Sequence, residues 1–165
     1  MINDDTRQTV KFIIWVVTIV IVCYFASIAI FYFSGKTVRT NDQQMKNVAI
    51  NQTPITNINK YYHLNRGTNS YALAGKDKKQ NNYYFIYLPK RKKAFLYEAK
   101  KGFTEKEITD KFKTSYPKKT INMINLGWYE GAPVWEVSYK NPNDKIGYLM
   151  YNFKNGTEIN KVDNL

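Results

Sequence analysis

An uncharged run of 22 residues, from Phe12 to Phe33, limits what this chain can fold into more than any other feature. As a helix it would be about 33 Å long, which exceeds the ~30 Å hydrocarbon core of a bilayer. It consists mostly of Ile, Val and Phe, and the hydroxyls of Thr18 and Ser27 can bond back to helix carbonyls. A buried helix of a soluble protein this long would carry a polar face, which this run lacks. The run therefore predicts a transmembrane helix over residues 12–34.

Two kinds of processed segment resemble such a helix, and the residues argue against both. A cleavable signal peptide has a shorter apolar region followed by small residues at its cleavage site, whereas here Ala26 and Ala29 lie inside the run. A bacterial lipoprotein needs a small residue before its modified cysteine, whereas Val22 precedes Cys23. Cys23 is the only cysteine, so the chain forms no intrachain disulfide.

The charges beside the helix leave its orientation open. Arg7 and Lys11 precede it, and Lys36, Arg39 and Lys46 follow it. This distribution does not favour a cytoplasmic N-terminus, but the positive-inside rule weakens when the following segment is a whole domain. The first 11 residues are too few to fold alone. The working part of the protein is therefore expected after the helix.

That part is basic and rich in aromatic residues. The acidic and basic residues before the helix cancel, so the whole net charge of +12 follows it. The chain also contains 14 Tyr and 9 Phe, whose large apolar area argues against disorder. Within the polar segment of residues 35–50 an amphipathic helix is predicted, which starts with Asn41 or Asp42 as N-cap and which Pro54 ends.

Strand-like runs and polar turns then alternate every 8–12 residues, which is typical of an antiparallel meander. The predicted strands cover residues 55–64, 70–75, 83–88 and 94–99.

A second helix is predicted by a capping box. Thr104 and Glu107 have the Ser/Thr-x-x-Glu spacing in which each side chain bonds the other residue's amide. Phe103 and Ile108 stand where a hydrophobic staple would form, and Pro117 ends the helix. Four further strands are expected at residues 120–128, 133–139, 145–153 and 157–162.

The two meanders align at a constant offset of 64 residues, with Tyr71 on Trp135 and Tyr87 on Tyr151. Identities are few, but the order of a helix followed by about four strands occurs twice. A helix packed across an antiparallel meander is the cystatin-like arrangement. The expected fold is therefore α+β: a transmembrane helix, then two small cystatin-like domains over residues 35–100 and 101–165.

Several segments resemble one known family, the TseB-like (YpmB) regulators of cell-wall elongation in Gram-positive bacteria. The most specific are Glu98–Glu105 (EAKKGFTE) and Trp135–Tyr139 (WEVSY), and the likeness covers essentially everything after the membrane helix. It implies two cystatin-like, PepSY-related domains outside the cell membrane, with residues 1–11 as a cytoplasmic tail. It also implies a non-enzymatic protein that associates with a penicillin-binding transpeptidase during peptidoglycan synthesis. The heavy Lys and Tyr content departs from the family pattern.

No motif for catalysis, a cofactor or a metal is visible. His63 is the only histidine and stands in a predicted strand without a cysteine partner, so a surface or packed residue is expected rather than a ligand. The sequence has no Gly-x-Ser-x-Gly, P-loop or Cys–His pair. Glu130 and Glu136 could face one another across a turn, but Glu136 is expected on the solvent face of its strand. A non-enzyme is predicted.

Basic residues cluster at the predicted turns. The candidate contacts for a polyanion are Lys78, Lys79, Lys90, Arg91, Lys92 and Lys93. Their plain interpretation is solubility, since turns are exposed. The functional alternative is attraction to anionic lipid or wall polymer, because a cation near such a surface gains about 1 kcal/mol. A nucleic-acid partner is not expected, although the anionic polymers that such a binding module could bind include DNA.

Trp128 and Tyr129 are either core residues, which alternation along the strand favours, or an exposed anchor for a partner. A protease inhibitor is a weaker option, suggested by the cystatin-like fold alone. The sequence leaves open the identity of the partner, the domain that binds it, the sense of regulation, the orientation of the domains and the oligomeric state.

Overall fold

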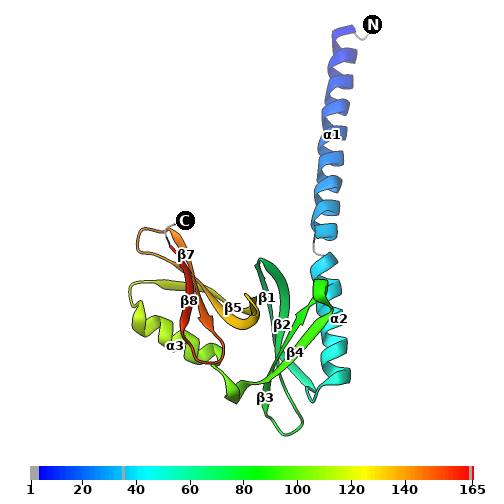
Figure 1. Cartoon of the computed structure of the whole chain (residues 1–165). Coiled ribbons are helices and arrows are strands. Elements are labelled where there is room, and N and C mark those ends of the chain that lie inside the picture. The colour runs from blue at the N-terminus through cyan, green and yellow to red at the C-terminus, as the bar shows by residue number, and fades with distance from the viewer. Residues whose placement is uncertain (1–3, 35, 164) are drawn as a thin grey trace. The chain divides into compact units, whose positions relative to one another are not determined.

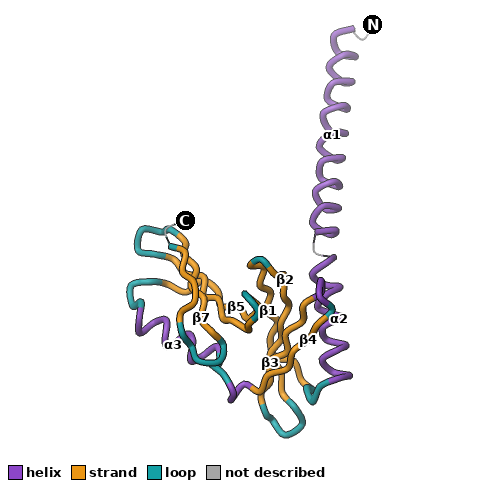
Figure 2. Tube along the Cα trace, in the orientation of Figure 1, coloured by secondary structure: helices purple, strands orange, loops and turns teal. Residues whose placement is uncertain are grey.

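The computed structural model describes residues 4–34, 36–163 and 165, and it divides into two units, residues 1–40 and 41–165 (Figures 1 and 2). The first unit contains helix α1 (Asp4–Ser34), which begins inside the predicted tail. Its segment Gln8–Ile30 is long and apolar enough to cross a membrane. The hydroxyl of Thr18 donates to the carbonyl of Ile14, and that of Ser27 to Cys23, both at 2.8 Å, which confirms the predicted back-bonding.

Helix α2 (Lys36–Gln52) follows and is longer than predicted. Asn41 and Asp42 lie inside it, so their assignment as N-cap was wrong. Residues 36–40 include neither proline nor glycine, so nothing in their backbone chemistry interrupts a helix there. Residue 35 lies outside the described residues. The helix ends two residues before Pro54, as predicted.

The first sheet is an antiparallel meander in the order β1-β2-β3-β4, and α2 lies against it (Figure 1). Its strands are β1 (Asn57–Arg66), β2 (Thr68–Lys76), β3 (Asn82–Leu88) and β4 (Lys93–Glu98), with a short 3₁₀ turn, η1 (Pro89–Arg91), before β4. Strands β2 and β3 are buried on both faces. One face packs with α2 in a cluster of Met45, Ala49, Ile55, Tyr71, Leu73 and Phe85.

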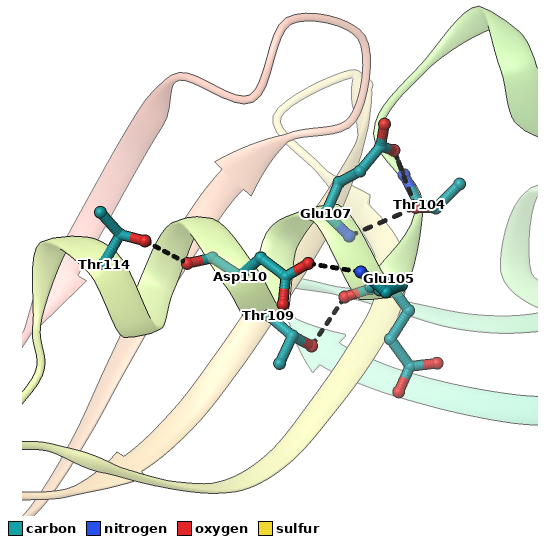
Figure 3. A network of polar contacts seen from close by, with 7 residues as sticks. Thr104, Glu105, Glu107, Thr109, Asp110 and Thr114 are labelled. Atoms are coloured by element: carbon teal, nitrogen blue, oxygen red, sulfur yellow. Dashed lines mark hydrogen bonds and ion pairs between the residues drawn. The ribbon is translucent and has the colours of Figure 1, made fainter.

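After the 3₁₀ turn η2 (Ala99–Lys101), helix α3 (Glu105–Ser115) begins at the predicted capping box (Figure 3). The Glu107 amide donates to the Thr104 hydroxyl at 3.3 Å, and the Thr104 amide donates to the Glu107 carboxylate at 2.7 Å. The carboxylate also accepts from the Thr104 hydroxyl at 2.7 Å. The bond from the Thr104 amide, and then that from its hydroxyl, hold the pKa of Glu107 below its ordinary value, because both favour the charged carboxylate. The helix turns Ile108 and Phe112 into the core.

The second sheet repeats the first in the order β5-β6-β7-β8. Its strands are β5 (Thr120–Tyr129), β6 (Ala132–Lys140), β7 (Ile146–Asn152) and β8 (Glu158–Val162). The β5–β6 hairpin closes through Glu130 and Gly131, both at positive φ, which is the geometry a two-residue hairpin turn requires. The predicted α+β class, with a helix against an antiparallel meander, is confirmed. The membrane span and the division into two cystatin-like domains stay predictions.

The largest apolar cluster contains residues of both sheets. The Trp135 ring of β6 meets the rings of Tyr62 and Tyr84 edge-on, at centroid distances of 5.6 and 5.3 Å, and Ile108 and Phe112 of α3 belong to the same cluster. The first sheet therefore packs α2 on one face and the second half of the chain on the other. This explains why β2 and β3 are apolar on both faces.

The β1–β2 hairpin also packs against β5, the edge strand of the second sheet. The buried Ser70 hydroxyl donates to the carbonyl of Leu64 and accepts from the amide of Trp128 in β5. Gly127 lies so close that an added Cβ would come within 2.3 Å of the Leu64 Cβ. Beyond this edge, Leu64 packs with Val134 and Met150 on the outer face of the second sheet.

Removal of the N-cap should destabilise α3 in a pH-dependent way. We expect Thr104→Ala to lower the free energy of unfolding by about 1 kcal/mol at pH 7. Because the pKa of Glu107 is lower in the folded chain, its contribution is present above the unfolded-state pKa and is lost as pH falls through the folded one. The difference between the two proteins should therefore shrink towards pH 3, as measured by urea unfolding.

The matched control is Thr114→Ala in the same helix, whose hydroxyl only bonds back to the carbonyl of Asp110 (Figure 3). It should change stability by less than about 0.5 kcal/mol. Equal losses for the two variants would contradict the capping role of Thr104.

Candidate functional site

A groove of about 910 Å³ lies between α3 and the edge strands β1 and β5. Its walls come from both halves of residues 41–165. Strand β1 contributes Lys60 and Tyr61, and β5 contributes the segment 120–125. Helix α3 and the loop after it, with Pro117 and Lys119, form the remaining wall. The shared core places these three elements side by side.

Polar side chains on α3 form one wall of the groove. Glu105, Thr109 and Lys113 are spaced four residues apart, so they share one helix face, while Ile108 and Phe112 face the core. Glu105 pairs with Lys60 at 2.5 Å and accepts a hydrogen bond of 2.7 Å from the Tyr62 hydroxyl. Burial, and then this bond to Glu105, raise the pKa of Tyr62. Lys113 makes no ion pair with any described residue.

The two strands at the groove are sheet edges, and each carries a bulge there. The pairing of β1 with β2 shifts between Ile58 and Lys60, and that of β5 with β6 shifts between Ile121 and Met123. A bulge bends an edge strand and re-aims its side chains. Beside these bulges, Tyr61 is 42% exposed and Met123 is 58% exposed. The groove is thus lined by large apolar side chains and open strand edges.

One end of the groove is fixed by contacts of Lys119. Its ammonium bonds Asp163 at 2.7 Å and lies 4.3 Å from the centre of the Tyr139 ring. The carboxylate of Asp163 also accepts from Asn141 at 2.6 Å. The bond from Lys119, and then that from Asn141, hold the pKa of Asp163 well below its ordinary value. These contacts tie the C-terminal residues to the start of β5.

The structure does not bring the predicted polyanion contacts together. Lys78 and Lys79 lie in the β2–β3 turn, whereas Lys90, Arg91 and Lys92 lie in the β3–β4 turn and Lys93 begins β4. These turns are at opposite ends of β3, roughly 20 Å apart at ~3.3 Å per residue. All six side chains are exposed, and none forms an ion pair with a described acidic residue. None of the six lines the groove.

The two aromatic candidates at the end of β5 have different environments. Trp128 is only 6% exposed and its ring stacks on Phe95 at a centroid distance of 4.2 Å. It is therefore a core residue, the alternative that strand alternation favours. Tyr129 is partly exposed, and its hydroxyl accepts a hydrogen bond from Asn160 at 3.2 Å.

The expectation that Glu136 lies on the solvent face was wrong. Its side chain is 6% exposed, and its carboxylate pairs with the Arg66 guanidinium at 2.5 Å. Arg66 also lies over the Tyr148 ring, 4.2 Å from its centre. Glu136 is buried because the β1–β2 hairpin of the first half covers this face of the second sheet. Glu130 is exposed in its turn and is no partner of Glu136.

His63 is an exposed residue of strand β1. Its ring stacks on Tyr71 at 4.6 Å, and its Nε2 lies 2.6 Å from the Asn69 side-chain oxygen. Among the residues that the structure describes, no three His, Cys, Asp or Glu side chains gather where they could hold a metal ion. The absence of a metal, a cofactor and an enzymatic activity stays a prediction.

The groove was missed at the level of sequence. Met123 and Lys113 lie 10 residues apart, in elements whose contact depends on how the halves pack. The one sequence feature that pointed to the groove was Met123, an apolar residue in a segment where apolar and polar residues do not alternate regularly. The alternation fails there because a bulge breaks the two-residue period of the strand.

Comparison with known proteins gives one structural match. The YpmB protein from Bacillus subtilis is 18% identical to this chain, with a TM-score of 0.63, and the match covers 73% of this chain and 95% of that chain. No protein-family model and no curated protein sequence matches. At this identity the comparison shows that the two chains share a YpmB-like fold.

Proposed function

We propose that this chain is a non-enzymatic, single-pass membrane protein that regulates peptidoglycan synthesis by binding a penicillin-binding transpeptidase outside the cell membrane. The observation that carries the proposal is the open groove at two strand edges, with Tyr61 and Met123 exposed in it. Exposed strand edges beside apolar side chains are surfaces that proteins use to bind extended segments of partners. The YpmB-like fold and the family resemblance supply the class of partner.

The apolar helix α1 supports this role physically. If it is embedded in the same bilayer as the partner, both proteins are confined to a thin layer. Confinement raises the effective concentration, so a weak contact at the groove would be sufficient for association. The proposed orientation places the N-terminus in the cytoplasm and residues 41–165 outside.

Orientation can be measured on the full chain. With Cys23→Ser as background, a cysteine at the exposed position Ser115 should react with a membrane-impermeant maleimide on intact cells. A reaction only after lysis would contradict the extracytoplasmic placement.

The partner can be captured at the groove. We expect a photocrosslinking residue in place of Met123, in the full chain in intact cells, to capture a penicillin-binding transpeptidase. The same residue in place of Asn143, exposed in the β6–β7 turn, should capture it at least tenfold less. The proposal fails if neither position captures a transpeptidase.

The alternative function is a basic binding module for anionic lipid, teichoic acid or DNA. It is favoured by the excess of 21 Lys and Arg over 11 Asp and Glu in residues 41–165. It is also favoured by the basic residues of the β2–β3 and β3–β4 turns, which form no ion pair with a described acidic residue. In the same experiment it would produce adducts with lipid or polymer rather than protein. Replacing Lys90, Arg91, Lys92 and Lys93 with glutamine would then reduce those adducts, most strongly at low salt.

A further inference from the structure

We infer that the groove binds an extended acidic segment of the partner, which adds as a strand to the free edge of β5. The inference rests on the proposed function, which supplies the protein partner. It adds that the groove recognises an acidic, extended segment of that partner. Three features of the described residues carry it: the free backbone edge, the exposed apolar side chains and the excess of lysine.

The backbone edge of β5 is covered at one end and open at the other. The amide of Trp128 points away from β6, since it donates to the Ser70 hydroxyl, and its ladder partner Pro133 has no amide to offer. Backbone groups alternate in direction along an antiparallel strand, so those of Leu126 and Ile124 also point away from β6. Ser70 and the β1–β2 hairpin close the edge at Trp128, while the segment 120–125 lines the groove.

The apolar side chains suit an extended chain. Met123 and Tyr61 are the most exposed large apolar residues of the groove, and Ile121 lies beside them. In an added strand every second side chain points to the same face. The side chains on one face of the partner segment could therefore contact Met123, Tyr61 and Ile121. Methionine adapts its shape to different partners, which favours a contact surface over a fixed core position.

The charges of the groove favour an acidic segment. Lys60, Lys113 and Lys119 line it against a single carboxylate, Glu105. Lys60 and Lys119 are already paired with Glu105 and Asp163, which leaves the Lys113 ammonium available to a ligand. A second copy of this chain fits poorly as the occupant, because residues 41–165 carry a net charge of +10 and would repel one another.

Three synthetic eight-residue peptides test the inference on the full chain in neutral-lipid nanodiscs. They alternate Val with Glu, Val with Gln or Val with Lys, and binding is followed by fluorescence anisotropy. We expect the Glu peptide to bind at least tenfold more tightly than the Lys peptide. N-methylation of every second amide should weaken the Glu peptide at least tenfold, because it blocks strand pairing. Hydrogen exchange at the amide of Ile124, which lines the groove, should slow on binding.

A matched pair of variants separates the groove from general charge attraction. Lys113→Glu should weaken the Glu peptide about tenfold, whereas Lys111→Glu, on the same helix but outside the groove, should change binding less than twofold. Equal effects of the two variants, indifference to N-methylation, or no saturable binding of any peptide would overturn the inference. If transpeptidase capture at position 123 succeeds while these tests fail, the proposed function stands and the acidic strand does not.

Discussion

Replacing Arg66 with methionine should lower the free energy of unfolding by about 3 kcal/mol, one of the largest effects expected in this protein. The change leaves the Glu136 carboxylate without its partner in a site where the glutamate side chain is only 6% exposed. The opposite variant, Glu136→Gln, should cost less, because the Arg66 side chain is 37% exposed and can turn towards water. Urea unfolding of the full chain in mild detergent, followed by circular dichroism, measures both.

The control is Arg91→Met, the same substitution at an exposed arginine that has no acidic partner among the described residues. It should change stability by less than about 0.5 kcal/mol. The double variant Arg66→Met with Glu136→Leu should recover much of the loss, since neither charge then remains buried. If Arg66→Met behaves like Arg91→Met, the pair does not join the two halves.

The second large effect is expected at the shared core. Trp135→Ala should lower the free energy of unfolding by about 3–5 kcal/mol, because it leaves a cavity between the sheets. It also removes the bond of 2.7 Å from the indole nitrogen to the carbonyl of Phe103. Trp135→Phe keeps a ring beside Tyr62 and Tyr84 but loses that bond, so it should cost about 1–3 kcal/mol.

The location of the damage is as informative as its size. Although Trp135 belongs to β6, hydrogen exchange should accelerate in both β3 and β6 of the alanine variant, because the Tyr84 ring packs on it. Unfolding should remain a single transition for residues 41–165. Two separate transitions, with β3 unaffected, would show that the halves are independent domains.

Much of the local structure was predictable because it depends on neighbouring residues. The capping box at Thr104 fixed the start of α3, and Pro54 and Pro117 marked the ends of α2 and α3. Turn residues such as Glu130 and Gly131 placed the hairpins, and the repeat of 64 residues anticipated the second meander. The start of α2 was missed because the capping preference of Asn41 and Asp42 is weaker than the continuity of a helix that already surrounds them.

The candidate site was not predictable in the same way. The sequence showed that the turns are basic, but it did not show their arrangement. In the meander the β2–β3 and β3–β4 turns lie at opposite ends of β3. Glu136 was assigned to solvent because its strand, taken alone, has an inner and an outer face. The β1–β2 hairpin, 70 residues earlier in the chain, brings Arg66 onto that outer face.

The amino-acid sequence by itself determined the apolar helix, the helix cap, the order of the strands and the strongly basic character of residues 41–165. These properties follow from hydrophobic periodicity, backbone preferences and charge, which act over a few residues. Only the tertiary structure decided that the two sheets share a core, that Glu136 is buried with Arg66, and that β1, β5 and α3 enclose a groove. Those features depend on which faces of the two halves meet, and contacts between residues far apart in the chain settle that choice.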